Sequence, residues 1–242
     1  MVVMGGFSRV VFGRSRLPSR AIVCAGVYFP SRKDAFHRSF DEWERLRGDW
    51  LKYSFARHSK RDYLVVFGIY GAAMMLETVQ LLREGGVQSI YMVGSMGARS
   101  LPVGTIVVPT AAEDKAGIVA LDNPRAKQAT PDRLMLNLTL RELRTRHLPF
   151  TRGLISSVPA VLHGIQHIEE HVKQAEGIIG HEMEGSTFLH FTKKHGIRAG
   201  MLLYVSDNDR HSIIAGAKGI RQARRKGLLS TAGVSVAVLA HF

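Results

Sequence analysis

The sequence contains a single cysteine, Cys24, among its 242 residues. One cysteine excludes an intrachain disulfide and any metal site built from several thiolates. Cys24 stands within the apolar run Ala21–Val27, where we expect it to pack in the core as a small hydrophobic side chain. The cysteine content therefore gives no indication of thiol chemistry.

Acidic residues are scarce. The sequence has 20 Asp and Glu residues and 33 Lys and Arg residues, which gives a formal net charge of +13. A positive field gathers anions, so the excess favours either a nucleic acid or a small phosphate-bearing substrate. The basic residues are spread along the chain, and no helix-turn-helix, zinc finger or basic strip interleaved with aromatics is present. We expect a small anionic substrate and no nucleic acid, and keep a nucleic-acid binder as an alternative.

The sequence also lacks an apolar run long enough to cross a bilayer, so we expect no membrane partner. The first acidic residue is Asp34, and an Arg-rich, acid-free N-terminus is typical of transit peptides. Pro18 and the glycines at positions 5, 6 and 13 would interrupt an amphipathic helix there. We therefore expect an ordered N-terminal arm over residues 1–20 and a cytoplasmic location.

Six short apolar runs, most of them rich in β-branched or aromatic residues, predict strands, and segments of helical periodicity lie between them. This alternation favours a mostly parallel α/β sheet covered on both faces, in a single domain over residues 1–242. The predicted strands are Ala21–Val27, Tyr63–Phe67, Ser89–Val93, Gly104–Val108, Arg152–Ser156 and Ala199–Val205. The predicted helices are Gly71–Gly85, Asp132–Arg146, Glu184–His195 and Ile213–Ala240.

Two predicted strands end in glycine-bearing turns, Gly68-Ile69-Tyr70-Gly71 and Gly94-Ser95-Met96-Gly97. Ligands of parallel α/β sheets bind at the carboxyl ends of the strands, where these turns lie. Glycine lets the backbone approach an anion, and a following helix offers free N–H groups. Neither turn matches a dinucleotide-binding or Walker loop, and each taken alone is explained equally well by the sterics of a tight turn.

The two turns are followed by His181-Glu182-Met183-Glu184-Gly185 and Val205-Ser206-Asp207-Asn208. This ordered set resembles the purine nucleoside and uridine phosphorylase superfamily, from about Ile22 to Asn208, and its Ser-Asp-Asn triplet is more similar to the purine and methylthioadenosine enzymes. The resemblance implies a three-layer α/β/α fold with a mostly parallel mixed central sheet, and a homo-oligomer, either a dimer or a trimer of dimers. It implies a pentosyltransferase of purine salvage that needs no cofactor and uses inorganic phosphate as co-substrate.

By the same resemblance, Glu184 holds the ribose hydroxyls, Met183 packs beneath the sugar, and Glu182 lies alongside. Asp207 donates a proton to purine N7, with Ser206 nearby. Cleavage of a glycosidic bond leaves negative charge on the departing base, so an acid there contributes roughly 10²–10⁴ in rate. A carboxylate that bridges two hydroxyls orients the sugar for attack. The alternative is that Glu184 caps a helix and Asp207 belongs to a turn.

The phosphate-binding residues of the family are only partly present. Its Gly-Asp-Pro-x-Arg loop reads Tyr28-Phe29-Pro30-Ser31-Arg32 here, which keeps the proline and the arginine and lacks the glycine and the aspartate. Arg47 matches an arginine that a neighbouring subunit donates in the family, and Gly94 with Ser95 matches its Gly-Ser or Gly-Thr turn. We therefore expect Arg32, Arg47 and Ser95 to bind phosphate and Gly94 to lie at the substrate.

Three departures leave the reaction open. Met92 stands where phosphorylases carry an arginine, which removes a charged hydrogen bond worth about 1.5–3 kcal/mol. Related nucleosidases activate water with a glutamate in the first loop, and no glutamate occurs between Ala21 and Ser39, so Arg32 favours phosphorolysis over hydrolysis. The aromatic cover of the base is replaced by Ala160, and the family's N-terminal histidine has no match. A hydrolytic nucleosidase and a non-catalytic nucleoside-binding relative therefore remain alternatives.

Three histidines, His163, His167 and His171, recur every four residues, close to the spacing of metal ligands on a helix. The pair His181-Glu182 does not begin a zinc-protease motif, because Gly185 takes the place of the second histidine. We expect a solvated or partly buried histidine face and no metal.

Overall fold

The computed structural model describes residues 6–26, 30–49, 51–98, 100–160, 177–211 and 218–242. The strands are β1 (Arg20–Ala25), β2 (Glu42–Trp43), β3 (Lys52–His58), β4 (Arg61–Ile69), β5 (Ser89–Gly97), β6 (Ile106–Asp114), β7 (Gln128–Ala129), β8 (Phe150–Ser157), β9 (Ile178–Glu182) and β10 (Arg198–Asp207). The helices are α1 (Phe7–Phe12), α2 (Pro30–His37), α3 (Ala72–Glu84), α4 (Ile118–Asp122), α5 (Arg133–Thr145), α7 (Gly185–Lys194) and α8 (Lys218–Leu239).

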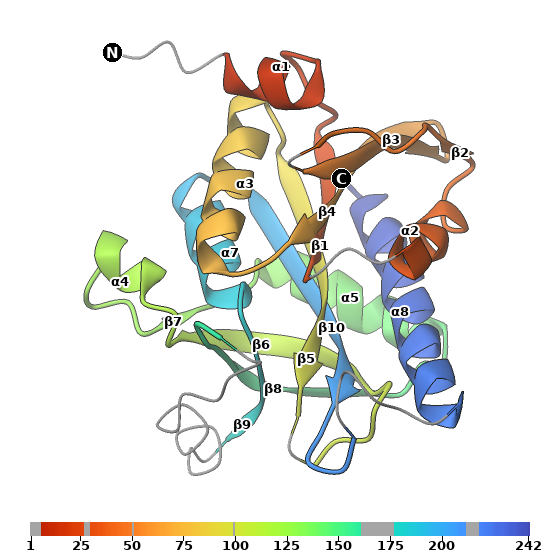
Figure 1. The fold of residues 1–242 in the computed structure, drawn as a ribbon, viewed down its shortest axis with the longest axis vertical. Helices are drawn as coiled ribbons and strands as arrows, with labels where there is room; N and C mark the ends of the chain where they lie inside the picture. The colour runs from red at the N-terminus through yellow and green to blue at the C-terminus, as the bar shows by residue number, and fades with distance from the viewer. Residues whose placement is uncertain (1–5, 27–29, 50, 99, 161–176, 212–217) are drawn as a thin grey trace.

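The sheet combines a parallel centre with a closed ring of strands. At the centre, β4, β1, β5 and β10 are parallel neighbours. From β10 the hydrogen bonding continues through β6, β8 and β9 and returns to β5, so these five strands form a ring. Beyond β4, the strands β3 and β2 extend the sheet in antiparallel fashion. Helices cover both faces, which confirms the predicted three-layer α/β/α fold with a mixed sheet (Figure 1).

Two hydrophobic cores lie on opposite faces of β1. Ala21 and Val23 belong to the core under α3 and α7, whereas Ile22 and Cys24 belong to the core under α5 and α8. Because both faces are covered, β1 is apolar from Ala21 to Ala25 instead of alternating with polar residues. Cys24 is buried as predicted, and burial raises the pKa of its thiol.

The four predicted helices form where periodicity placed them, as α3, α5, α7 and α8, although residues 213–217 lie outside the described part of the last one. Asp132 caps α5 by accepting a hydrogen bond from the N–H of Met135. The N-terminal arm contains α1, whose Phe12 packs edge-on against Tyr53 with 5.0 Å between ring centroids. Among the described residues, no helix has both the length and the apolar character to span a membrane.

One predicted turn is wrong, because Gly94 to Gly97 continue β5 as strand. Gly94 pairs with Leu203 of β10, and the pairing runs on to the end of the strand. A Cβ on Gly94 would lie 3.1 Å from Cδ2 of Leu203 and 3.3 Å from the Cβ of Ala25. Residue 94 is small because neighbouring strands pack closely there, and not because the chain reverses.

Candidate active site

The candidate residues lie at the carboxyl ends of the parallel strands. β1 ends at Ala25, β4 leads into Gly71, β5 ends at Gly97 and β10 ends at Asp207. The antiparallel strand β9 joins this edge because its His181 pairs with Gly97. Since parallel strands end on the same side of a sheet, residues distant in sequence meet here, where α/β proteins bind their ligands.

Glu184 lies at the start of α7 with only 4% of its surface exposed. Its Oε1 accepts a hydrogen bond of 2.6 Å from the N–H of Gly71, in the turn that follows β4. Met183 reaches the same turn, because a Cβ on Gly71 would lie 3.8 Å from its Cε. The Glu184 side chain makes no capping hydrogen bond to α7. Glu184 is thus the N-cap residue of α7 by position, but its side chain is directed to Gly71 and does not cap the helix.

Glu182 provides the capping hydrogen bonds at this helix end. Its Oε2 accepts from the N–H groups of Glu184 at 2.8 Å and Gly185 at 2.7 Å, and its Oε1 accepts from the hydroxyl of Ser157. A carboxylate at a helix N-terminus also interacts favourably with the helix dipole. Glu182 thus holds the segment that carries Glu184 in place, and its predicted contact with a substrate stays a prediction.

The two buried carboxyl groups affect each other. Burial raises the pKa of Glu184 to about 8, and the Coulombic effect of Glu182 adds to the rise, while the N–H of Gly71 and the charge of Arg32 oppose it. Burial also raises the pKa of Glu182, against the hydrogen bond from Ser157. A carboxyl that titrates near neutrality is typical of functional sites.

Arg32 brings a buried cation to this edge. It is 7% exposed and donates hydrogen bonds to the carbonyl of Ala25 and, at 3.4 Å, to Oγ of Ser95. A Cβ on Gly26, whose φ is +93°, would lie 3.0 Å from both terminal guanidinium nitrogens. A side chain at position 26 would therefore occupy the place of the Arg32 guanidinium. Within the described part of the chain Arg32 forms no ion pair, so its charge is available to an anion.

Asp207 lies on the same side of β5 as Ser95. In the sheet Asp207 pairs with Gly97, and Ser206 donates a hydrogen bond of 2.5 Å from Oγ to Oδ1 of Asp207. Ser95 and Gly97 are two positions apart, so they face one side of the strand and are separated by about 7 Å along it. The Arg32–Ser95 pair and the Asp207 carboxyl therefore face the same side of β5.

The structure adds His181, to which the sequence reasoning assigned no role. A Cβ on Gly97 would lie 2.7 Å from Nε2 of His181 and 3.2 Å from Oδ2 of Asp207. The imidazole of His181 and the carboxyl of Asp207 therefore both border the space that a side chain at position 97 would fill. The available signal in the sequence was its position directly before Glu182 and Met183 at the end of a strand.

Comparison with known proteins identifies the family. The model of the phosphorylase superfamily matches residues 37–237, which is most of the chain. The chain belongs to the phosphorylase superfamily. The predicted resemblance is thereby confirmed, and so is the prediction of a pentosyltransferase-like enzyme at the level of the superfamily. No sequence of a curated protein matches the chain.

Solved structures of other phosphorylase-superfamily proteins share the fold. Uridine phosphorylase from Vibrio fischeri superposes with a TM-score of 0.80 at 19% identity, covering 93% of each chain. Purine nucleoside phosphorylase from Toxoplasma gondii gives 0.78 at 15% identity, covering 93% of this chain and 91% of that one. The 5'-methylthioadenosine/S-adenosylhomocysteine nucleosidase from Neisseria meningitidis gives 0.71 at 16%, covering 92% and 98%.

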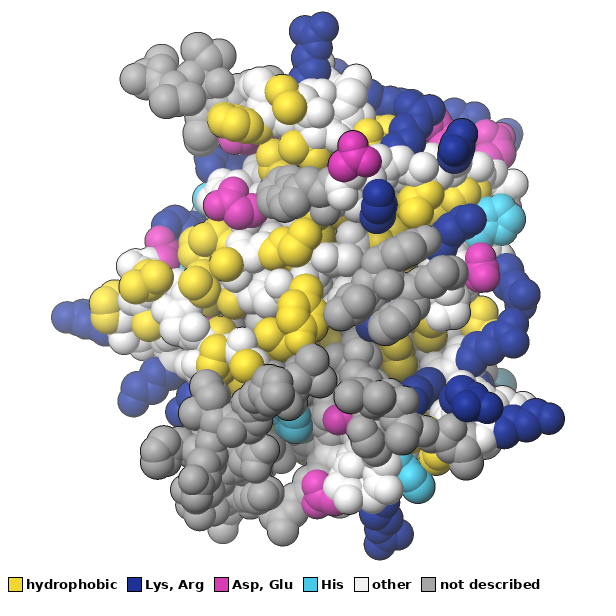
Figure 2. All heavy atoms as spheres, viewed as in Figure 1, with side chains coloured by type: hydrophobic (Ala, Val, Ile, Leu, Met, Phe, Trp, Pro, Cys, Tyr) yellow, Lys and Arg dark blue, Asp and Glu magenta, His cyan; other side chains and the backbone are white. Residues whose placement is uncertain are grey.

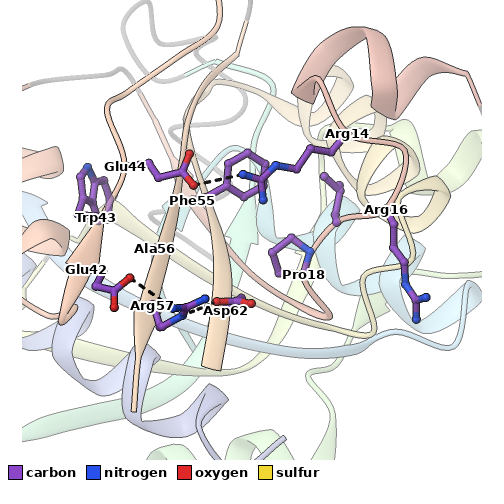
Figure 3. Close-up of a pocket in the computed structure, with 11 residues that line it drawn as sticks. Arg14, Arg16, Pro18, Glu42, Trp43, Glu44, Phe55, Ala56, Arg57 and Asp62 are labelled. Atoms are coloured by element: carbon purple, nitrogen blue, oxygen red, sulfur yellow. Dashed lines mark hydrogen bonds and ion pairs between the residues drawn. The ribbon is translucent and has the colours of Figure 1, made fainter. Parts of the chain in front are cut away.

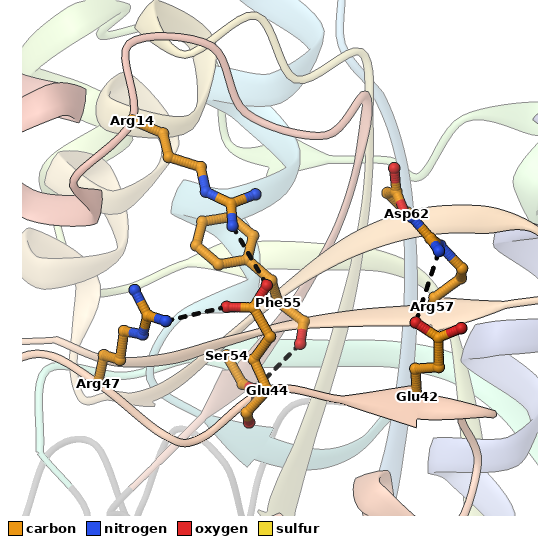
Figure 4. Close-up of polar contacts among 8 residues, drawn as sticks. All are labelled: Arg14, Glu42, Glu44, Arg47, Ser54, Phe55, Arg57 and Asp62. Carbon is orange, nitrogen blue, oxygen red and sulfur yellow. Dashed lines mark hydrogen bonds and ion pairs between the residues drawn. The ribbon is translucent and has the colours of Figure 1, made fainter.

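Arg47 and Met92, both considered above in connection with phosphate binding, lie outside the group formed by Arg32, Ser95 and Asp207. The Arg47 side chain is 57% exposed and pairs with Glu44 at 3.3 Å, close to Arg14 (Figure 4). Its donation to a neighbouring subunit stays a prediction. Met92 is fully buried in the core under α3 and α7, so this position supplies no cation.

The predicted histidine face, made of His163, His167 and His171, lies outside the described residues. Among the residues that the structure describes, no group of three or more His, Cys, Asp or Glu side chains is arranged to hold a metal ion. The expected absence of a metal therefore stays a prediction for the whole chain.

A pocket of about 580 Å³ lies elsewhere, between the N-terminal arm and β2–β3 (Figure 3). The guanidinium of Arg14 lies 3.7 Å from the ring centroid of Phe55 and pairs with Glu44, and Arg57 pairs with Asp62 at 2.8 Å. These opposite charges offset one another, so the pocket is a poor site for an anion. On the face drawn in Figure 2, Lys and Arg side chains are scattered and form no continuous strip.

Proposed function

We propose that the chain cleaves the N-glycosidic bond of a purine-type nucleoside by phosphorolysis, giving the free base and ribose 1-phosphate. The observation that carries the proposal is the buried Arg32, paired with the hydroxyl of Ser95 at the strand edge that also holds Glu184 and Asp207. A cation without a carboxylate partner in the described chain is suited to an anionic co-substrate.

Each residue has a defined task in this reaction. Arg32 and Ser95 bind inorganic phosphate. Glu184, which ionises as the pH approaches its pKa of about 8, accepts hydrogen bonds from the ribose hydroxyls, with Met183 beneath the sugar. A phosphate oxygen attacks the anomeric carbon as the bond to the base breaks and its electron pair moves onto the base. Asp207, oriented by the hydroxyl of Ser206, gives its proton to N7 of the purine.

The proposal includes the finer expectations drawn from the sequence. The substrates are a nucleoside and phosphate, without a nucleic acid or a membrane as partner and without a further cofactor. The protein acts in purine salvage in the cytoplasm, as a homo-oligomer in which Arg47 reaches the site of a neighbouring copy. The exposed position of Arg47 supports that last point, because its side chain is accessible to another chain.

Hydrolysis on the same scaffold is the second candidate, and one observation favours it. Met92, fully buried, leaves the site with one cation fewer than the phosphorylase pattern provides. With weaker phosphate binding, water would take the place of phosphate at the anomeric carbon and free ribose would be released.

A panel of purine and pyrimidine nucleosides, assayed with and without phosphate, separates the two reactions. Phosphorolysis predicts a rate that rises with phosphate concentration and a sugar product identified as ribose 1-phosphate. Base release at equal rates with and without phosphate, with free ribose as the product, would replace the proposal by hydrolysis. Nucleoside binding in calorimetry without turnover of any substrate would indicate a non-catalytic relative.

A further inference from the structure

A row of polar side chains crosses the ring of strands and ends at Asp207. Glu113 pairs with Ser156, Ser156 pairs with His181, His181 pairs with Gly97, and Gly97 pairs with Asp207. Residues directly opposite one another on neighbouring strands project to the same face. The row therefore places the imidazole of His181 one strand away from Asp207, with Gly97 between them. In the proposed function, the Asp207 carboxyl protonates the leaving base.

Gly97 leaves the space that the ends of the His181 and Asp207 side chains border. Its position is strand without a positive φ, so the backbone itself does not require glycine. Space does require it, because a Cβ there would stand 2.7 Å from Nε2 of His181 and 3.2 Å from Oδ2 of Asp207. Both polar atoms thus converge on the place of the missing methyl group.

The residues behind His181 are polar as well. Ser156 is fully buried, and its Oγ donates to Oε2 of Glu113 at 3.4 Å. Glu113 in turn pairs with Lys115 at 3.2 Å. The imidazole thus lies between a buried hydroxyl with a charged partner on one side and Asp207 on the other, which is a polar setting.

We infer that His181 acts through Asp207 in protonating the departing base. The inference rests on the proposed function, since it concerns the same site. As the bond from the anomeric carbon to the base breaks, the Asp207 carboxyl gives its proton to the base nitrogen. The carboxylate then takes a proton from the imidazolium of His181, which regains one from solvent. His181 is thus a positioning and proton-supplying residue that does not itself touch the sugar.

The test compares two leaving groups. A purine base leaves with the help of a proton, whereas the nitrophenolate of p-nitrophenyl β-D-riboside leaves without one. Because a positioned acid contributes roughly 10²–10⁴ in rate, we expect His181→Ala to lower kcat on the best purine nucleoside at least tenfold. The rate on the nitrophenyl riboside should change by less than about threefold.

His181→Gln keeps a hydrogen-bonding group but transfers no proton, so it should give the same selective loss, and it serves in place of His181→Ala if that variant does not fold. His241→Gln, near the C-terminus and 42% exposed, is the matched control and should behave as wild type on both substrates.

Equal losses on both substrates would assign His181 a merely structural role and overturn the inference, as would no loss on either. A wild-type protein that cleaves neither riboside would overturn the proposed function, and the inference with it. The activity of the wild type therefore separates the two failures.

Discussion

The main-chain N–H of Gly71 donates a 2.6 Å hydrogen bond to Oε1 of Glu184, although 113 positions separate the two residues in the sequence. The bond ties the turn after β4 to the start of α7. The carboxyl assigned to the ribose is therefore fixed by two segments from different parts of the chain, and its geometry exists only once the sheet between them has assembled. This arrangement leads to predictions about both activity and stability.

Replacing Glu184 by Gln keeps the shape of the side chain and removes its charge. Hydrogen bonds to a charged group contribute about 1.5–3 kcal/mol each, so kcat/KM for nucleosides should fall roughly tenfold to several hundredfold. Steady-state kinetics on the preferred nucleoside measures the change. Glu77→Gln, on the exposed surface of α3, should leave kcat/KM unchanged. Full activity of Glu184→Gln would show that the charge of Glu184 is not used in binding the ribose.

The stability of the unliganded protein should decrease with rising pH because of Glu184. Its pKa is raised from an ordinary 4.5 to about 8, so the folded chain holds this proton more tightly than the unfolded chain. The resulting stabilisation is complete below the ordinary pKa and disappears as the pH rises through about 8. Tm measured from about pH 5 to about pH 9 should fall, and less so in Glu184→Gln. An identical pH dependence in both proteins would contradict the assignment.

Ser157 matters for stability through Glu182. Removing its hydroxyl by Ser157→Ala leaves a buried carboxylate with one hydrogen bond fewer, and the N–H of Ser186, which donates to the same hydroxyl, loses its acceptor. The expected cost is about 1–3 kcal/mol in the free energy of unfolding. Urea denaturation measures it, with the exposed Thr145→Ala on α5 as the control expected to stay close to wild type.

Arg32 should account for most of the phosphate binding that the reaction rate depends on. Arg32→Met removes a charged donor of similar length, and the KM for phosphate should rise roughly tenfold to a hundredfold while the KM for the nucleoside changes little. Initial rates at varied phosphate test this. The exposed Arg38→Met removes the same charge away from the site and should have no such effect. An unaltered KM for phosphate in Arg32→Met would show that Arg32 does not bind phosphate.

Gly97→Ala should lower the activity and leave the stability almost unchanged. The added methyl group would displace the ends of the His181 and Asp207 side chains, which stand 2.7 Å and 3.2 Å from it. Because these are ends of flexible side chains, Tm should change little, whereas kcat on purine nucleosides should fall at least tenfold. Gly219→Ala, in α8 where a Cβ meets nothing within 4 Å, should keep full activity.

The fold was largely predictable from local patterns. The periodicity of Asp132–Arg146 and the stop at Gly85 mark helices that the structure contains, because amphipathic spacing and capping act within one or two turns. The strands β2 and β7 were missed since two residues carry no periodicity, and β9 was missed because it has few apolar residues. The seven-residue strand β3 was also missed, because it mixes charged and aromatic residues and has no continuous apolar run. The short helices α1, α2 and α4 were missed as well.

The site was predictable in its residue types but not in its contacts. The order of the motifs singled out Glu184, Asp207, Arg32 and Ser95, which the structure brings to one sheet edge, and their roles stay predictions. Register between distant strands determines the rest, so neither the capping role of Glu182 nor the approach of His181 to Asp207 is visible in the sequence. The same holds for Gly94, whose size is set by Leu203 and Ala25.

The closed circuit of β10, β6, β8, β9 and β5 also bears on self-association. Each strand of this circuit has a neighbour on both sides, although β9 meets β5 at a single residue pair. The described sheet ends in the two-residue strand β2, with the equally short β7 beside β6. Short outer strands give another molecule little main chain to extend. Copies of this protein should therefore join through packed side chains rather than through a continuous intermolecular sheet.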